Sequence, residues 1–124
     1  MENNKRTVII GATNNPDRYA FEAASRLQQN GYEFVPVGIK TGEVFGQEIQ
    51  DLRQKPVIAD VDTVTLYMNP QRQAEWEDYI LSLNPRRIIF NPGTENPSLF
   101  EKATQNGIEA LHACTLVMLG IGTY

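Results

Sequence analysis

The sequence predicts an α/β fold, a doubly wound and mostly parallel sheet of five to six strands with helices on both faces. Short β-branched and apolar runs without polar alternation recur along the 124 residues, as is typical of strands buried on both faces. Segments with apolar residues at helical spacing follow these runs, and parallel strands need such crossover helices. The length fits one domain, so we expect residues 1–124 to form a single unit.

The chain begins with a predicted strand, loop and helix. Residues 7–10 form a β-branched run that predicts a buried strand ending at Gly11. Pro16 then opens a predicted helix, and Gly31 ends it as a C-cap. Four apolar residues at the spacing of one helical face are expected to be buried: Ala20, Ala23, Ala24 and Leu27.

The middle of the chain repeats this alternation after an irregular stretch. Residues 34–37 predict a second strand, in which Pro36 favours an edge or a strand end because it has no amide hydrogen. Residues 38–55 are expected to be irregular, and residues 63–67 predict the next strand. A helix should start at Pro70, with an apolar stripe at Trp76, Tyr79, Ile80 and Leu83.

The last third contains two more predicted strands, at residues 87–90 and 109–113. Between them, a helix should start at Asn96-Pro97 and stop at Gly107. The tail, residues 114–124, is mostly apolar, and it either packs on its own sheet or forms an interface.

Five of the seven prolines follow an asparagine. Three of these pairs, at positions 15, 69 and 96, stand where a predicted strand-to-helix loop ends. Asparagine is a favoured N-cap and proline suits the first helical turn, so the pairs predict helix starts. We expect only Asn15-Pro16 also to face a ligand.

Charge and cysteine content narrow the class of protein. With 11 Lys and Arg against 15 Asp and Glu, the net charge of −4 disfavours a nucleic-acid partner, although it allows a local basic pocket. Residues 1–7 are polar, and no apolar run approaches the ~20 residues of a membrane span, so we expect neither a signal peptide nor a membrane partner. Cys114 is the only cysteine, so we expect a cytoplasmic protein without a cysteine-rich metal site.

The exit of the first predicted strand has the features of a phosphate-binding loop. Gly11 permits a tight turn next to Ala12, Thr13 and Asn14 offer polar donors, and a helix N-terminus follows. Arg18 stands in that first turn, where it can meet an anion. Only the first glycine of the G-x-G-x-x-G fingerprint is present, so a plain strand-to-helix turn remains the alternative.

Two other regions are expected to meet at this loop. Lys40 follows the second strand where NAD-binding proteins place an acid, which favours a ribose carrying a phosphate, as in coenzyme A and NADP. Asn69 and Arg72 leave the third predicted strand at the expected reversal of strand order, and they are candidates for nucleotide contact. For Asn69, simple helix capping is the alternative.

Three runs of the sequence resemble the small CoA-binding proteins, which are stand-alone relatives of the CoA-binding domain of succinyl-CoA synthetase. They are residues 8–19 (VIIGATNNPDRY), 31–37 (GYEFVPV) and 42–46 (GEVFG). The resemblance covers nearly the whole chain and implies a Rossmann-like fold. It also implies that Gly11, Thr13, Asn14, Pro16 and Arg18 hold the CoA diphosphate, and that the loop with Gly93 lies near the pantetheine.

The leading hypothesis is therefore a protein that binds coenzyme A or acyl-CoA without catalysis of its own. An NADP-dependent oxidoreductase is an alternative, although the chain leaves little room for a catalytic domain. A regulatory subunit that senses a nucleotide, or a homodimer formed through residues 116–121, is another. His112 and Cys114 should share one face of the last strand, where a reactive thiol near CoA and an ordinary packed cysteine are both open.

Overall fold

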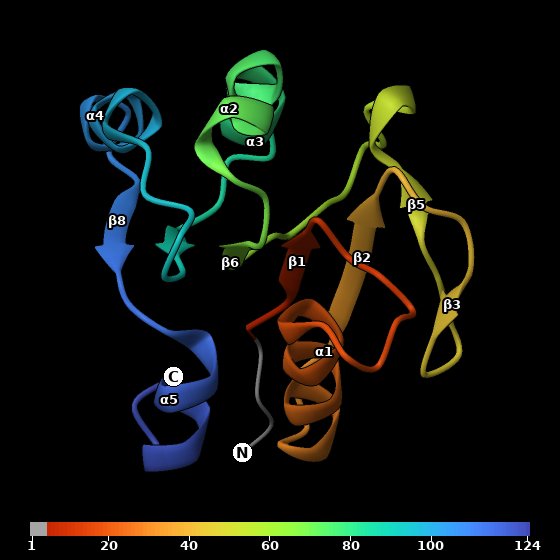
Figure 1. The fold of residues 1–124 in the computed structure, drawn as a ribbon. Coiled ribbons are helices and arrows are strands. Elements are labelled where there is room, and N and C mark those ends of the chain that lie inside the picture. Colours follow the sequence, from red (N-terminus) through yellow and green to blue (C-terminus); the bar gives the residue numbers. More distant parts are fainter. Residues whose placement is uncertain (1–4) are drawn as a thin grey trace.

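The fold is a six-stranded parallel sheet between two layers of helices (Figure 1), seen in a computed structural model that describes residues 5–124. The strand order is β5-β2-β1-β6-β7-β8, and every neighbouring pair is parallel. The chain moves outward from β1 to β2 and β5, then returns to the other side of β1 with β6. The predicted doubly wound α/β fold is confirmed. Residues 1–4, on which the expectation of no signal peptide partly rests, lie outside the described part.

The strands of the main sheet are β1 (Thr7–Ile10), β2 (Phe34–Gly38), β5 (Gln50–Asp51), β6 (Thr63–Leu66), β7 (Arg87–Phe90) and β8 (Glu109–His112). A separate hairpin contains β3 (Glu43–Val44) and β4 (Gln47–Glu48). The α-helices are α1 (Tyr19–Gln29), α2 (Pro70–Gln73), α3 (Glu77–Ser82), α4 (Pro97–Gln105) and α5 (Thr115–Ile121). Short 3-10 turns occupy Leu52–Gln54 and Ala74–Trp76.

The central strands are buried on both faces, as their uninterrupted apolar runs predict. Every residue of β1, β6 and β7 is buried. Successive side chains enter opposite layers: Val8 packs in the cluster with α3 and α4, whereas Ile9 packs in the cluster with α1 and α5. Figure 1 shows the same division, with α1 and α5 on one side of the sheet and the other helices opposite.

The first helix starts later than predicted. It begins at Tyr19 rather than at Pro16, and its N-cap residue is Arg18, whose side chain makes no capping hydrogen bond. Asn15 instead closes a local turn, because its Oδ1 accepts a hydrogen bond from the Asp17 amide (2.9 Å). The predicted buried face of Ala20, Ala23, Ala24 and Leu27 is confirmed.

The other two predicted caps are confirmed. The Asn69 side chain accepts a hydrogen bond from the Arg72 amide (2.9 Å), and Asn96 does the same for Leu99 (3.3 Å). However, the predicted helix after Pro70 is broken into α2, a 3-10 turn and α3. Its stripe still faces the core, with Trp76 only half-buried.

The expectation of an irregular stretch at residues 38–55 was wrong. The segment contains the β3–β4 hairpin and β5, which pairs with Val37 and Gly38 only. The amides of Thr7 and Gly11 bond to the carbonyls of Glu33 and Val37, so the odd-numbered residues of β2 face β1. Pro36 therefore faces the side of β5, where it is buried next to the two residues of β2 that pair with β5. β2 is thus not the edge strand that a proline favours, but the short pairing of β5 does not need the missing amide hydrogen.

The C-terminal tail packs on its own sheet through α5. Leu119 is buried in the cluster that contains residues of α1, while Val117 and Ile121 are exposed. No helix within residues 5–124 is long and apolar enough to cross a membrane.

Candidate functional site

A cleft of about 650 Å³ opens at the carboxyl ends of β1, β2, β6 and β7. Its walls are the β1–α1 loop with the first residues of α1, the exit of β2, the β6–α2 loop and the β7–α4 loop. The cleft spans the boundary between β1 and β6, where the order of strands reverses. Ligands of open parallel sheets bind at this position.

Gly11 lets the first loop pass close to the neighbouring strand. Its φ is +97°, and a Cβ atom there would lie 2.9 Å from the carbonyl carbon and oxygen of Tyr67. A side chain at position 11 would therefore both strain the backbone and push the β1 and β6 exits apart. Gly11, which the sequence predicts to permit a tight turn, thus also allows the exits of β1 and β6 to lie close together.

The N-terminal end of α1 is left open toward the cleft. The backbone amides of four residues donate no hydrogen bond within residues 5–124: Thr13, Asn14, Tyr19 and Ala20. All four residues line the cleft. Tyr19 and Ala20 are the first two residues of α1, where unbonded amides carry partial positive charge and favour an anionic ligand group. The amides of Thr13 and Asn14 add donors from the preceding loop.

The exit of β2 is pressed against this loop. A Cβ atom at Gly38 would lie 2.7 Å from the Ala12 carbonyl oxygen, so a larger residue there would meet backbone. Lys40 follows on the cleft wall, and the next turn brings Gly42 against the Asn14 side chain, where a Cβ would lie 2.5 Å from Nδ2. The segment predicted to be irregular therefore supports both Asn14 and Lys40.

Cations gather at the cleft although the chain is acidic overall. Arg18, Lys40 and Arg72 line it, are exposed, and form no ion pair with any residue of the described chain. The Glu95 carboxylate borders the opposite end, since its Oε1 accepts a hydrogen bond from the Gly93 amide (3.0 Å). The cleft is thus suited to anionic groups near α1 and β2 and to an uncharged group near Gly93.

A buried amide side chain holds the far wall of the cleft, which the β6–α2 and β7–α4 loops form. The Asn91 Nδ2 donates to the Leu66 carbonyl (2.8 Å) and to Thr65 Oγ1 (2.7 Å), and its Oδ1 accepts from the Thr115 amide (2.8 Å). The side chain therefore joins the end of β6, the end of β7 and the start of α5. The β7–α4 loop therefore begins at Asn91, whose side chain is held by these three hydrogen bonds.

Tyr67 lines the cleft without offering its hydroxyl to a ligand. The residue lines the cleft, but its hydroxyl oxygen is buried and makes no hydrogen bond within residues 5–124. Burial, together with the neighbouring Cys114, raises the pKa of the Tyr67 hydroxyl, so the group stays protonated. The side chain of Tyr67 can therefore contact a ligand only through its apolar atoms.

All but one of the predicted ligand-binding residues come together in the cleft. Pro16 is the exception, because it lies in the exposed turn before α1 and is not part of the lining. The residues that do line it are Gly11, Ala12, Thr13, Asn14, Arg18, Lys40, Asn69, Arg72 and Gly93. Sequence reasoning did not select Gly38, Tyr67 or Thr94, which also line it. Their one shared signal is a place at the end of a predicted strand or shortly after it.

The prediction that His112 and Cys114 share one face of the last strand was wrong. β8 ends at His112, whose ring contacts Phe100 with centroids 4.6 Å apart. Cys114 instead occupies the N-cap position of α5 and is half-buried. The two-residue alternation of a strand does not extend to Cys114.

Comparisons with known proteins match nearly the whole chain. A family model described as a CoA binding domain matches residues 5–120. A crystal structure of an uncharacterized protein is 55% identical, has a TM-score of 0.95, and is matched over 99% of this chain and 100% of that one. Among curated proteins, no significant match is found.

More distant structures share the fold. A hypothetical protein from Pyrococcus horikoshii is 24% identical with a TM-score of 0.78, over 91% of this chain and 80% of that one. A Thermus thermophilus protein is 22% identical with a TM-score of 0.80, over 97% and 90%. Because the family model covers nearly all of the described residues, the chain belongs to the family of CoA-binding domains.

Proposed function

We propose that the cleft binds coenzyme A or an acyl-CoA and that the protein performs no catalysis of its own. The observation that carries the proposal is the open N-terminus of α1, whose unbonded amides belong to residues that line the cleft with Arg18. A diphosphate would satisfy these amides and pair with the guanidinium group. Membership of the family of CoA-binding domains supports the choice of ligand.

The remaining parts of CoA suit the other walls. Lys40 at the exit of β2 would pair with the phosphate on the ribose, since it forms no ion pair within residues 5–124. The uncharged pantetheine arm would run past the Tyr67 ring toward Gly93, where Glu95 disfavours a further phosphate. The proposed contact residues are thus those of the cleft wall, without Pro16.

Calorimetric titration of the protein with CoA, 3′-dephospho-CoA, NADP and NAD tests the proposal. We expect CoA to bind tightest and NAD not to bind. At a concentration ~100 times its dissociation constant, CoA should stabilise the fold by about 2.7 kcal/mol. Absence of CoA and acetyl-CoA binding at millimolar concentration would overturn the proposal, and tighter binding of NADP would favour a dinucleotide site instead.

A Lys40→Ala variant tests the position of the ligand. Its affinity for CoA should fall about tenfold, while its affinity for 3′-dephospho-CoA should stay unchanged, because only CoA carries the phosphate that Lys40 meets. Lys55→Ala is the matched control, since Lys55 is an exposed lysine outside the cleft. Equal losses for both ligands would place the ribose phosphate elsewhere.

A further inference from the structure

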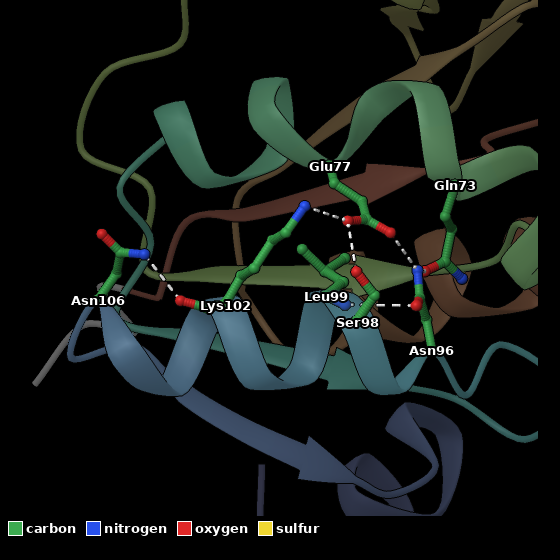
Figure 2. A network of polar contacts seen from close by, with 7 residues as sticks. All are labelled: Gln73, Glu77, Asn96, Ser98, Leu99, Lys102 and Asn106. Carbon is green, nitrogen blue, oxygen red and sulfur yellow. Dashed lines mark hydrogen bonds and ion pairs between the residues drawn. The ribbon is translucent and has the colours of Figure 1, made fainter.

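A chain of buried side-chain hydrogen bonds leads from the surface of α4 to the wall of the cleft (Figure 2). Its central members, Gln73, Glu77 and Asn96, are at most 6% exposed, so their bonds form away from solvent. Figure 2 shows these residues between the helix that carries Glu77 and α4. Buried polar groups of this kind fix one another's orientation, because each donor needs an acceptor.

Gln73 is the member that reaches the cleft. Its Nε2 donates to the Met68 carbonyl (2.7 Å) and to the Thr94 carbonyl (2.8 Å). Met68 belongs to the β6–α2 loop, Thr94 belongs to the β7–α4 loop, and both line the cleft. One side-chain amide therefore sets the spacing between two loops of the far wall.

Asn96 decides which way the Gln73 amide points. Its Nδ2 donates to Gln73 Oε1 (3.0 Å) and to Glu77 Oε2 (2.9 Å), while its Oδ1 caps α4 at the Leu99 amide. Since both a carboxylate and a helix N-terminus act on Asn96, its amide has one satisfied orientation. That orientation turns Oε1 of Gln73 toward Asn96 and leaves Nε2 for the two loop carbonyls.

Glu77 is the fixed acceptor at one end of these hydrogen bonds, because a carboxylate only accepts hydrogen bonds. Its other oxygen, Oε1, accepts from Lys102 Nζ (2.9 Å) and from Ser98 Oγ (3.1 Å). Burial raises the pKa of the Glu77 carboxyl, but the hydrogen bonds from Asn96, Lys102 and Ser98 outweigh it and hold the pKa below its usual value. Glu77 stays ionised at neutral pH and therefore fixes the donor-to-acceptor direction along these hydrogen bonds.

We propose that Gln73 is a positioning residue of the cleft, aligned by Glu77 through Asn96, and that this alignment sets the affinity for the ligand. The inference rests on the proposed binding of CoA and adds residues that touch no part of the ligand. Glu77 and Asn96 are not part of the cleft lining, so their effect on binding would pass through Gln73.

The first test removes the hydrogen bonds of Gln73 but keeps its shape, with Gln73→Met. We expect the affinity for CoA to fall at least tenfold under conditions where circular dichroism shows the variant fully folded. Thr63→Val is the matched control, because it removes a buried acceptor of the Arg87 Nε (2.7 Å) at the amino ends of the strands, away from the cleft. Its affinity should stay within about twofold of the unsubstituted protein. Equal affinities of Gln73→Met and the unsubstituted protein would overturn the inference.

Hydrogen exchange separates this inference from the proposed function. In Gln73→Met, amides of residues 67–69 and 91–94 should exchange faster than in the unsubstituted protein, whereas Thr63→Val should leave them unchanged. If the unsubstituted protein does not bind CoA, the proposed function fails, and the exchange data alone decide the role of Gln73. Unchanged exchange in these loops would refute that role.

The second test reverses the donor-to-acceptor direction of these hydrogen bonds while keeping the cap of α4. Asn96→Asp preserves a good N-cap, but its carboxylate would face Glu77 and draw the Nε2 of Gln73 away from the loop carbonyls. We expect both stability and CoA affinity to fall. The double variant Asn96→Asp/Glu77→Gln relieves the repulsion between the two carboxylates, so it should regain stability without regaining affinity. Affinity that recovers in step with stability would show a merely structural network.

Discussion

Gly38→Ala is expected to destabilise the protein, although alanine usually suits a strand better than glycine. Gly38 closes β2, and a Cβ atom there would lie 2.7 Å from the Ala12 carbonyl oxygen and 3.2 Å from its amide nitrogen. The loop cannot easily retreat, because the amides of Gly11 and Ala12 both bond to the Val37 carbonyl, at 2.9 and 3.0 Å. The new methyl group would therefore clash with a backbone segment that hydrogen bonds hold in place.

Two opposing effects set the magnitude. The backbone of Gly38 is not left-handed, so alanine alone would stabilise by about 0.4–1 kcal/mol through the unfolded chain. Overpacking against backbone costs about 1–3 kcal/mol and exceeds that gain. We expect a net loss of about 1.5 kcal/mol in the free energy of unfolding, which corresponds to roughly 6 °C in Tm for a chain of this size.

Urea denaturation followed by circular dichroism measures this loss as a lower midpoint at an unchanged slope. Gly120→Ala provides the matched control, because Gly120 lies in α5 and a Cβ atom there would have no neighbour within 4 Å. That variant should be more stable by about 0.5–1 kcal/mol. A Gly38→Ala midpoint equal to or above that of the unsubstituted protein would refute the reasoning about the contact with Ala12.

Three further outcomes are expected. Leu99→Ala should cost about 2–5 kcal/mol in thermal or urea unfolding, because Leu99 is fully buried between α4 and the sheet; a loss under 1 kcal/mol would contradict this packing. Asn69→Ala should cost about 1 kcal/mol as the loss of an N-cap, whereas Asn15→Ala, which caps no helix, should cost less; a larger loss at Asn15 would argue against the observed start of α1. Because the folded pKa of Glu77 lies below its usual value of 4.5, its stabilising effect is complete above that value and is lost as the pH falls through the folded pKa. Glu77→Gln should flatten this acid limb of a stability-against-pH curve, and an unaltered curve would count against the ionised network.

Local patterns were sufficient to predict most of the architecture. The runs at residues 7–10, 63–67 and 87–90 have no polar alternation, and all became buried parallel strands. Asn96-Pro97 started a helix because both residues act within one turn. The two failures have different causes. At Asn15 the side chain accepts a hydrogen bond from the Asp17 amide in its own turn and so caps no helix. The β3–β4 hairpin and β5 depend on pairing that such two-residue strands do not reveal in the sequence.

The cleft was predictable in part for the same reason. Loops that follow parallel strands meet at one edge of the sheet, so Gly11, Lys40 and Arg72 could be expected together. The buried amides of Gln73 and Asn91 were not predictable, because polar residues in a helix and a loop are usually exposed. Only the packed structure shows that they hold the walls of the cleft.

Pro36 also bears on how the sheet ends. It is buried, it faces the side of β2 on which β5 pairs, and it has no amide hydrogen to donate to a longer β5. β5 forms this edge of the main sheet and contains only two residues, Gln50 and Asp51. A very short edge strand exposes few unpaired backbone groups, so it limits intermolecular strand addition, which is a common route to aggregation. The proline in β2 thus restricts pairing one strand further out, at the edge that another molecule would meet.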